Sequence, residues 1–123
     1  MSEIKNSNKY DLEERTYKFA GRVQDYIKAL PKTISNFEYG KQLIRSSGSQ
    51  GANYMEANAA SSRKDFGNKI FICKKEAQET KHWLRMLATY LPEKKEEIMA
   101  LWKECQELTL IFQKIGSSLK IGD

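Results

Sequence analysis

Apolar residues recur every three or four positions through most of the chain, which is the spacing of one face of an α-helix. The first such stretch ends before Pro31, because proline disfavours helix in the residue that precedes it. Asp11, followed by Glu14 three residues later, has the pattern of a capping box. We therefore expect this helix to begin at Asp11 and residues 1–10 to be flexible. Its apolar stripe is Leu12, Phe19, Ala20, Val23, Tyr26, Ile27 and Leu30.

A second helix is expected from the capping box Ser35–Glu38 to about Ala60. Its inward positions are unusual, because they include small and polar residues. Gly48 and Gly51 each cost a helix about 1 kcal/mol relative to alanine. A break near residues 46–49 is the alternative, but the spacing resumes in phase, which favours one continuous helix. The expected inward positions are Gly40, Leu43, Ile44, Ser47, Gly51, Tyr54 and Asn58.

Two further helices carry heptad-like seams, in which apolar steps of three and four alternate. The third begins near Ser62, with Asp65 three residues later, and ends at Pro92. The fourth runs from Pro92 to Ile115, with Gly116 as a C-terminal cap, and residues 120–123 are expected to fray. The third seam is Phe66, Ile70, Cys73, Ala77, Thr80, Leu84, Leu87 and Leu91; the fourth is Ile98, Leu101, Cys105, Leu108, Phe112, Ile115 and Leu119.

Four amphipathic helices joined by short connections predict an all-α fold, an antiparallel up-down-up-down four-helix bundle. The chain of 123 residues is one domain in length, and we place that domain at residues 11–119. Only 7 Gly and 2 Pro occur, too few turn residues for a β-sandwich or barrel.

The compartment is predicted from what the sequence lacks. The N-terminus is polar and unlike a signal peptide, and no apolar run approaches the roughly 18 residues of a membrane span. We therefore expect a cytoplasmic protein that does not enter the membrane. Cys73 and Cys105 both fall on apolar stripes, so we expect two reduced core cysteines rather than the alternative of a disulfide.

The net charge of +5 is unevenly distributed. Residues 63–91 hold seven basic and three acidic residues, so this helix carries most of the excess. A basic stripe can follow a phosphate backbone, although a merely solvated helix face has the same pattern. No aromatic residue is interleaved with the cations as in a single-strand stacking platform. The candidate nucleic-acid contacts are Arg15, Lys18, Arg22, Arg63, Lys64, Lys69, Lys74, Lys81 and Arg85.

An enzymatic site finds little support. A two-metal bundle site needs two Glu-x-x-His pairs, and this chain has one, from Glu79 to His82, its single histidine. No nucleotide-binding glycine motif is present. We therefore expect no catalytic residues, no metal and no cofactor. Polar residues beside the apolar stripes are instead expected to pair between helices or across subunits: Arg45, Asn53, Glu56, Glu76 and Glu79.

The stretch from Arg45 to Leu87 reads RSSGSQGANYMEANAASSRKDFGNKIFICKKEAQETKHWLRML. It resembles the four-helix-bundle proteins encoded in intervening sequences of bacterial large-subunit ribosomal RNA genes. Gln50 and Gly67 depart from that pattern, because the family usually has apolar residues at these two positions. We therefore expect Gln50 to weaken one core contact and Gly67 to loosen the start of the third helix. The motif residues, to which the resemblance gives a structural role, are Arg45, Ser49, Gly51, Asn53, Glu56, Phe66, Glu76, Glu79 and Trp83.

The resemblance also implies partners. The chain is similar in expected architecture to the accessory variability determinant of diversity-generating retroelements, which implies a homopentamer that binds nucleic acid and a reverse transcriptase. Apolar residues beyond the seams independently favour self-association, with a monomer of thicker core as the alternative; they are Phe71, Ile72, Trp83, Trp102 and Ile111. Two functions follow as hypotheses: a non-enzymatic oligomer that binds RNA or DNA, or an adaptor that docks a reverse transcriptase or another protein.

Overall fold

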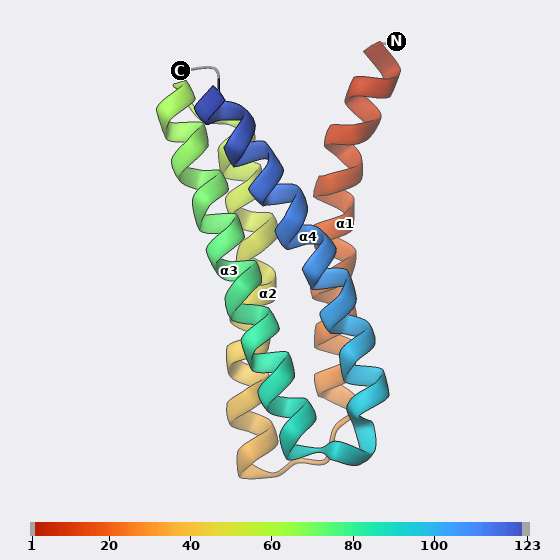
Figure 1. The fold of residues 1–123 in the computed structure, drawn as a ribbon. Helices are drawn as coiled ribbons and strands as arrows, with labels where there is room; N and C mark the ends of the chain where they lie inside the picture. The colour runs from red at the N-terminus through yellow and green to blue at the C-terminus, as the bar shows by residue number, and fades with distance from the viewer. Residues whose placement is uncertain (1, 122–123) are drawn as a thin grey trace.

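Four long α-helices run alternately up and down in the computed structural model (Figure 1). The structure describes the backbone of residues 2–121 and the side chains of residues 12–119. No strand occurs in that part of the chain, so the predicted all-α four-helix bundle is confirmed. The helices are α1 (Ser2–Ala29), α2 (Ile34–Asn58), α3 (Arg63–Tyr90) and α4 (Lys95–Ile121), and a short 3₁₀ turn, η1 (Pro92–Lys94), joins the last two.

Helix α1 begins at Ser2, so the predicted start at Asp11 is wrong. The helix simply continues through the Asp11–Glu14 pattern, which does not act as a cap here. The flexibility of residues 1–10 stays a prediction. Figure 1 shows that the first turns of α1 diverge from α4 while its second half lies along the other helices. The bundle is therefore tightest towards the end of α1.

The loop before α2 is fixed by two polar contacts. Thr33 has an extended backbone, and its hydroxyl accepts a hydrogen bond from the amide N of Asn36 at 3.1 Å. The Asn36 side chain donates back to the carbonyl of Pro31 at 3.0 Å. The N-cap of α2 is therefore Thr33, and the predicted cap at Ser35 is wrong because Ser35 already lies inside the helix.

Of the other predictions about the helices, the start of α3 and the continuity of α2 are confirmed, and the C-terminal cap of α4 is wrong. Ser62 caps α3, and its hydroxyl accepts from the amide N of Asp65 at 3.0 Å, as predicted. Helix α2 is continuous through Gly48 and Gly51, which confirms that interpretation over a break. Helix α4 continues past Gly116 to Ile121, so Gly116 is not a cap. Fraying of residues 120–121 stays a prediction, and residues 122–123 lie outside the described residues.

One apolar core runs through the bundle and includes residues from all four helices. On α2 four predicted inward positions are buried, Gly40, Leu43, Ser47 and Tyr54. Ser46 and Gln50 are also fully buried, whereas Ile44, predicted to face inward, is 39% exposed. Gly51 and Asn58 are only half-buried. Ser46 fits because a small residue allows α2 to approach its neighbours closely, whereas Gln50 fits because its amide donates a hydrogen bond to Thr80. The largest fully buried side chains are Phe19, Phe112, Leu43, Ile70, Leu84, Leu87, Ile98 and Leu108.

Candidate nucleic-acid interface

One member of the predicted basic stripe on α3, Lys81, contacts α4. Lys81 donates to the side-chain oxygen of Gln106, and its ammonium nitrogen lies 5.5 Å from the centre of the Trp102 ring. Lys74 is half-buried, whereas Arg85 is exposed. Lys81 is thus partly engaged within the fold, which makes it a weaker candidate for phosphate contact than its spacing predicted.

Two further candidates are held by carboxylates. Arg15 donates to both oxygens of Glu104, at 2.8 and 2.9 Å, and to Glu107 at 2.9 Å, which ties α1 to α4. These hydrogen bonds raise the pKa of Arg15. Lys69 donates to Glu56 at 2.8 Å, and this bond raises the pKa of Lys69. Each pair offsets a positive charge, so neither residue adds much to an interface for a polyanion.

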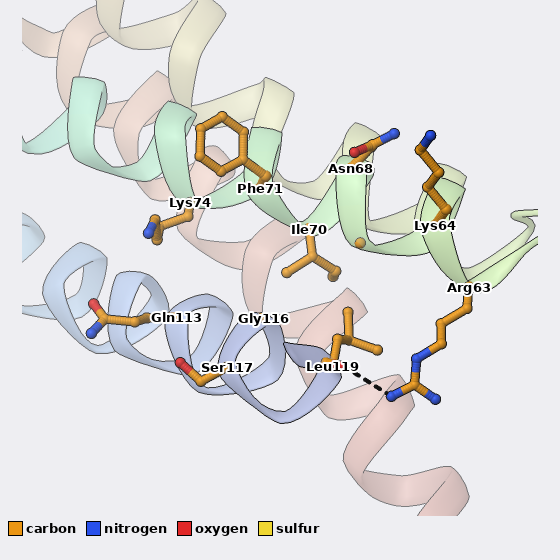
Figure 2. Close-up of a pocket in the computed structure, with 11 residues that line it drawn as sticks. Arg63, Lys64, Asn68, Ile70, Phe71, Lys74, Gln113, Gly116, Ser117 and Leu119 are labelled. Atoms are coloured by element: carbon orange, nitrogen blue, oxygen red, sulfur yellow. Dashed lines mark hydrogen bonds between the residues drawn. The ribbon is translucent and has the colours of Figure 1, made fainter. Parts of the chain in front are cut away.

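The remaining candidates lie on two surfaces. Lys18 and Arg22 are exposed on α1. Arg63, Lys64 and Lys74 instead gather where α3 begins and α4 ends, around a cavity between these two helices (Figure 2). Residues 63–75 contain five basic residues and one acidic residue, and residues 108–119 contain Lys114 and no acidic residue. We call the surface formed by 63–75 and 108–119 the basic end.

The opposite end of the bundle is different in charge. Residues 92–97, in η1 and the start of α4, contain three acidic and two basic residues. Lys28 and Lys32 lie nearby, at the end of α1 and in the loop that follows it. Counted together, these residues are four basic and three acidic, so the opposite end is mixed in charge, whereas the basic end has six basic residues and one acidic residue.

An exposed aromatic ring accompanies the cations of the basic end. Phe71 is 61% exposed, and the ammonium nitrogen of Lys74 lies 5.9 Å from its ring centre. The prediction that no aromatic residue is interleaved with the cations is therefore wrong. The signal was present in the sequence, because Phe71 falls outside the apolar seam and between Lys69 and Lys74.

Several motif residues lie along the contact between α2 and α3. Arg45 pairs with Glu76 at 3.2 Å and also with Glu79, and Glu56 pairs with Lys69. The expected pairing between helices is thus seen at Arg45 and Glu56, within one chain.

Ser49 and Asn53 bond along their own helix instead. Ser49 donates to the carbonyl of Arg45 at 2.9 Å, and Asn53 donates to the carbonyl of Ser49 at 2.8 Å. Asn53 thus bonds along α2, and its expected pairing across helices stays a prediction.

The other motif residues contribute to packing. Phe66 and Trp83 lie half-buried against the core, and the Trp83 ring is 4.9 Å from that of His82 in an edge-on arrangement. A Cβ atom added to Gly51 would lie 3.1 Å from the hydroxyl of Thr16, so Gly51 allows α1 to approach α2. These positions stabilise the bundle and do not assemble a reactive group.

Gln50 stands at the centre of a buried polar cluster. Its amide donates to Thr80 at 3.1 Å and to the Cys105 sulfur at 3.7 Å, and Thr80 donates to Ser46 at 2.9 Å. The amide oxygen of Gln50 has no partner within the described residues. The motif departure at Gln50 therefore replaces an apolar core position with a hydrogen-bonded one.

The two cysteines are free and buried, as predicted. Burial raises the pKa of both Cys73 and Cys105 to about 12, which keeps the thiols protonated and poorly nucleophilic near neutral pH. Among the described residues, no group of three or more His, Cys, Asp or Glu side chains is arranged to hold a metal ion. Nor does any helix in that part of the chain have the length and apolar character of a membrane span.

Apolar surface is exposed on α2, where the sequence reasoning did not place it. Ile34 is 85% exposed, Phe37 67% and Met55 63%. Together with Ile44 they recur at steps compatible with one outer face of α2, and we call these four residues the α2 stripe. Of the residues predicted to be surplus, Trp83, Trp102 and Ile111 instead pack against the core. The signal was the recurrence of apolar residues at steps of three, seven and eleven, which return to one face of a helix.

Comparison with known proteins decides the family. Residues 8–114 match the 23S rRNA-intervening sequence protein family. The chain belongs to this family. A crystal structure of a protein with unknown function from the S23 ribosomal protein family of Bacteroides thetaiotaomicron superposes with a TM-score of 0.81. Its sequence is 32% identical, over 89% of this chain and 97% of that one.

The family assignment confirms the resemblance drawn from residues 45–87 and the four-helix layout. The 23S rRNA-intervening sequence protein family is not a known enzyme family, and the Bacteroides neighbour is of unknown function. A search among curated proteins finds no match to this chain. The similarity to the accessory variability determinant stays a prediction.

Proposed function

We propose that this chain is a non-enzymatic, homo-oligomeric bundle protein that binds RNA through the phosphate backbone at its basic end. The observation that carries the proposal is the placement of charge. Arg63, Lys64 and Lys74 surround one cavity, and the described residues that line it include no carboxylate. Lysine and arginine side chains that neutralise phosphates supply most of the sequence-independent affinity for nucleic acid.

The expected recognition is of backbone and shape. Phosphate contacts position a nucleic acid but carry no direct sequence information, and the helices offer no groove-reading motif. RNA is the polyanion of the proposal, and DNA is the alternative that a probe of the same sequence in DNA separates. We therefore expect binding to different RNA sequences with similar affinity and strong dependence on salt.

The oligomeric part of the proposal is supported by the α2 stripe. Ile34 and Phe37 are the two most exposed apolar residues of α2, and contiguous exposed apolar surface is typical of an interaction site. The pentamer implied by the resemblance is our proposal for the assembly. Light scattering of the wild type should give about five times 14.2 kDa, and Ile34→Glu with Phe37→Glu should lower it. A mass near 14.2 kDa for the wild type would remove this part.

Fluorescence anisotropy with a labelled RNA tests the binding directly. Lys64→Glu with Lys74→Glu should raise the apparent Kd by at least tenfold, because each charge reversal replaces attraction to phosphate with repulsion. The matched control is Lys28→Glu with Lys32→Glu, which makes the same change in net charge at the opposite end. Equal losses in the two double variants would show that only net charge matters and would contradict a site at the basic end.

A second candidate is an adaptor that docks a reverse transcriptase or another protein, and the α2 stripe also favours it. The two functions separate by experiment. An adaptor without RNA binding would show no anisotropy change with RNA at low salt, while the α2 variants would lose a co-purifying partner and keep their mass. Tyr17→Glu, at a residue 75% exposed on α1, is the control for a surface charge outside the stripe.

A further inference from the structure

The cavity at the basic end has the size and lining of a ligand site. Its volume is about 660 Å³, within the range of cavities that hold small ligands. Its apolar side is formed by Gly67, Ile70 and Leu119, which lie where α3 and α4 approach each other (Figure 2). Polar groups border it: the amides of Asn68 and Gln113 and the hydroxyl of Ser117. A mixed lining of this kind suits a ligand with both a flat apolar part and many hydrogen-bonding groups.

Cations lie at both ends of the cavity. Arg63 and Lys64 stand at the first turn of α3, and Lys74 stands three turns further on (Figure 2). At 1.5 Å per residue, Arg63 and Lys74 are separated by roughly 16 Å along the helix. Arg63 donates to the carbonyl of Leu119 at 3.1 Å, which positions its guanidinium across the gap between α3 and α4. The cavity is thus a groove, long enough for more than one phosphate group.

Phe71 gives this groove a second chemical character. Its ring is largely exposed beside Lys74, and no apolar partner in the core accounts for it. An exposed aromatic ring next to cations in a groove is the arrangement by which proteins bind single strands, since bases stack on the ring while phosphates meet the charges.

Building on the proposed function, we propose that the groove binds a short single-stranded segment of RNA. One base stacks on Phe71, and its flanking phosphates contact Lys74 and the cations at the start of α3. Asn68, Gln113 and Ser117 provide hydrogen bonds to sugar or base edges. Stacking accepts any base, so the segment need have no fixed sequence. The basic end therefore prefers unpaired RNA, such as a loop, over a continuous duplex.

The experiment is a titration with a labelled oligonucleotide short enough to occupy one groove, so that oligomeric avidity does not contribute. Phe71→Ala should raise the Kd by roughly tenfold, in line with the loss of one stacked base. Phe71→Trp keeps a ring at this position and should bind as tightly as the wild type. Tyr17→Ala is the matched control, because Tyr17 is also an exposed aromatic residue but lies on α1, outside the groove and the α2 stripe. An oligonucleotide abasic at its centre, a duplex of the same length and a free mononucleotide complete the set.

A cavity-filling variant tests the groove without removing an aromatic ring. A Cβ atom added to Gly116 would meet nothing within 4 Å, and the same holds for Gly48 on α2. Gly116→Leu should therefore fold, fill the groove and weaken binding of the single strand. Gly48→Leu makes the same change outside the groove and should bind as the wild type does.

Each outcome decides between the claims. The groove proposal is supported by two results together. Phe71→Ala and Gly116→Leu bind the single strand more weakly than the wild type does, and the wild type binds the abasic and duplex probes more weakly than the intact single strand. Unchanged binding by these variants overturns the groove but leaves RNA binding at the basic end standing. If Phe71→Ala forms a smaller assembly by light scattering but binds RNA as the wild type does, Phe71 lies in a subunit contact. That result also overturns the single-strand proposal. If the wild type binds no RNA at low salt, both proposals are overturned. If the mononucleotide binds most tightly of all the probes, the groove holds a small ligand, and the single-strand proposal is overturned.

Discussion

At the scale of single residues, Gln50 shows how one polar side chain is accommodated in a core. Its amide nitrogen bonds to Thr80, and Thr80 in turn donates to Ser46 and to the carbonyl of Glu76. A buried hydrogen bond contributes about 1 kcal/mol net, whereas an unpaired buried group costs about 1–3 kcal/mol. Gln50 therefore does more than weaken a contact, because it links α2 to α3 through a polar network. Hydropathy alone cannot reveal such a network.

Gly40 marks a close approach of α2 to α1. A Cβ atom at this position would lie 2.6 Å from the branched methyl Cγ2 of Ile27, too close for any real contact. Gly40→Ala should lower the free energy of unfolding by about 1–2 kcal/mol, because overpacking outweighs the gain in helix propensity. Gly48→Ala, at a position with open space, should raise it by about 1 kcal/mol. Urea denaturation measures both, and stabilisation by Gly40→Ala would contradict the close approach.

The buried thiols predict a loss of stability in alkaline solution. Burial raises the pKa of Cys73 and Cys105 from near 9 to about 12. Below pH 9 the thiols are protonated in both the folded and the unfolded protein, so the free energy of unfolding is unaffected. Between pH 9 and 12 the thiols of the unfolded protein lose their protons first, so the free energy of unfolding falls. The expected slope is up to about 1.4 kcal/mol per pH unit for each thiol. Unfolding measured from pH 8 to 10.5 should show a steeper decline in the wild type than in Cys73→Ala with Cys105→Ala, and equal slopes would contradict this.

At the scale of helices, α1 is attached differently from the rest. Its first turns diverge from α4 (Figure 1), and Arg15 is the residue that bridges the two helices, with its guanidinium bound to both oxygens of Glu104. A two-pronged contact of this kind needs the planar guanidinium and is not reproduced by lysine.

Arg15→Lys should therefore lower the free energy of unfolding by about 0.5–1 kcal/mol. It should also speed hydrogen exchange in α1 more than elsewhere, because Arg15 joins α1 to Glu104 and Glu107 on α4. Arg22→Lys, at an exposed position on the same helix, is the control and should leave both quantities unchanged. Exchange that increases uniformly through the bundle would show that Arg15 does not act locally.

The helices themselves were largely predictable, and the failures share a physical cause. The Ser62 cap was found because Ser-x-x-Asp precedes a clear apolar stripe. The register of α2 was predicted in part: Leu43, Ser47 and Tyr54 are buried as expected, whereas Ile44 faces outward and Ser46 and Gln50 are buried. On that helix, hydrogen bonding and close packing select some of the inward residues, so a pattern based on apolarity turns the inward face by a fraction of a turn.

At the scale of the whole molecule, the site depends on how the helices meet. The sequence located the charge on the third helix, and the antiparallel bundle followed from the helix pattern. It did not reveal that Arg63, Lys64 and Lys74 share one cavity with the last turns of α4. That cavity arises because Gly67 and Gly116 leave space between α3 and α4, which becomes apparent only once the two helices are packed together.

The salt dependence of RNA binding tests the central claim most directly. For single strands, log K falls with log salt at a slope of about −0.7 for each phosphate neutralised. Wild-type binding of a short single-stranded probe should therefore weaken steadily with salt, and removing the two groove lysines in Lys64→Gln with Lys74→Gln should make the slope shallower by about 1.4. Wild-type protein that shows no binding at low salt, or a slope that the double variant leaves unchanged, would contradict the account.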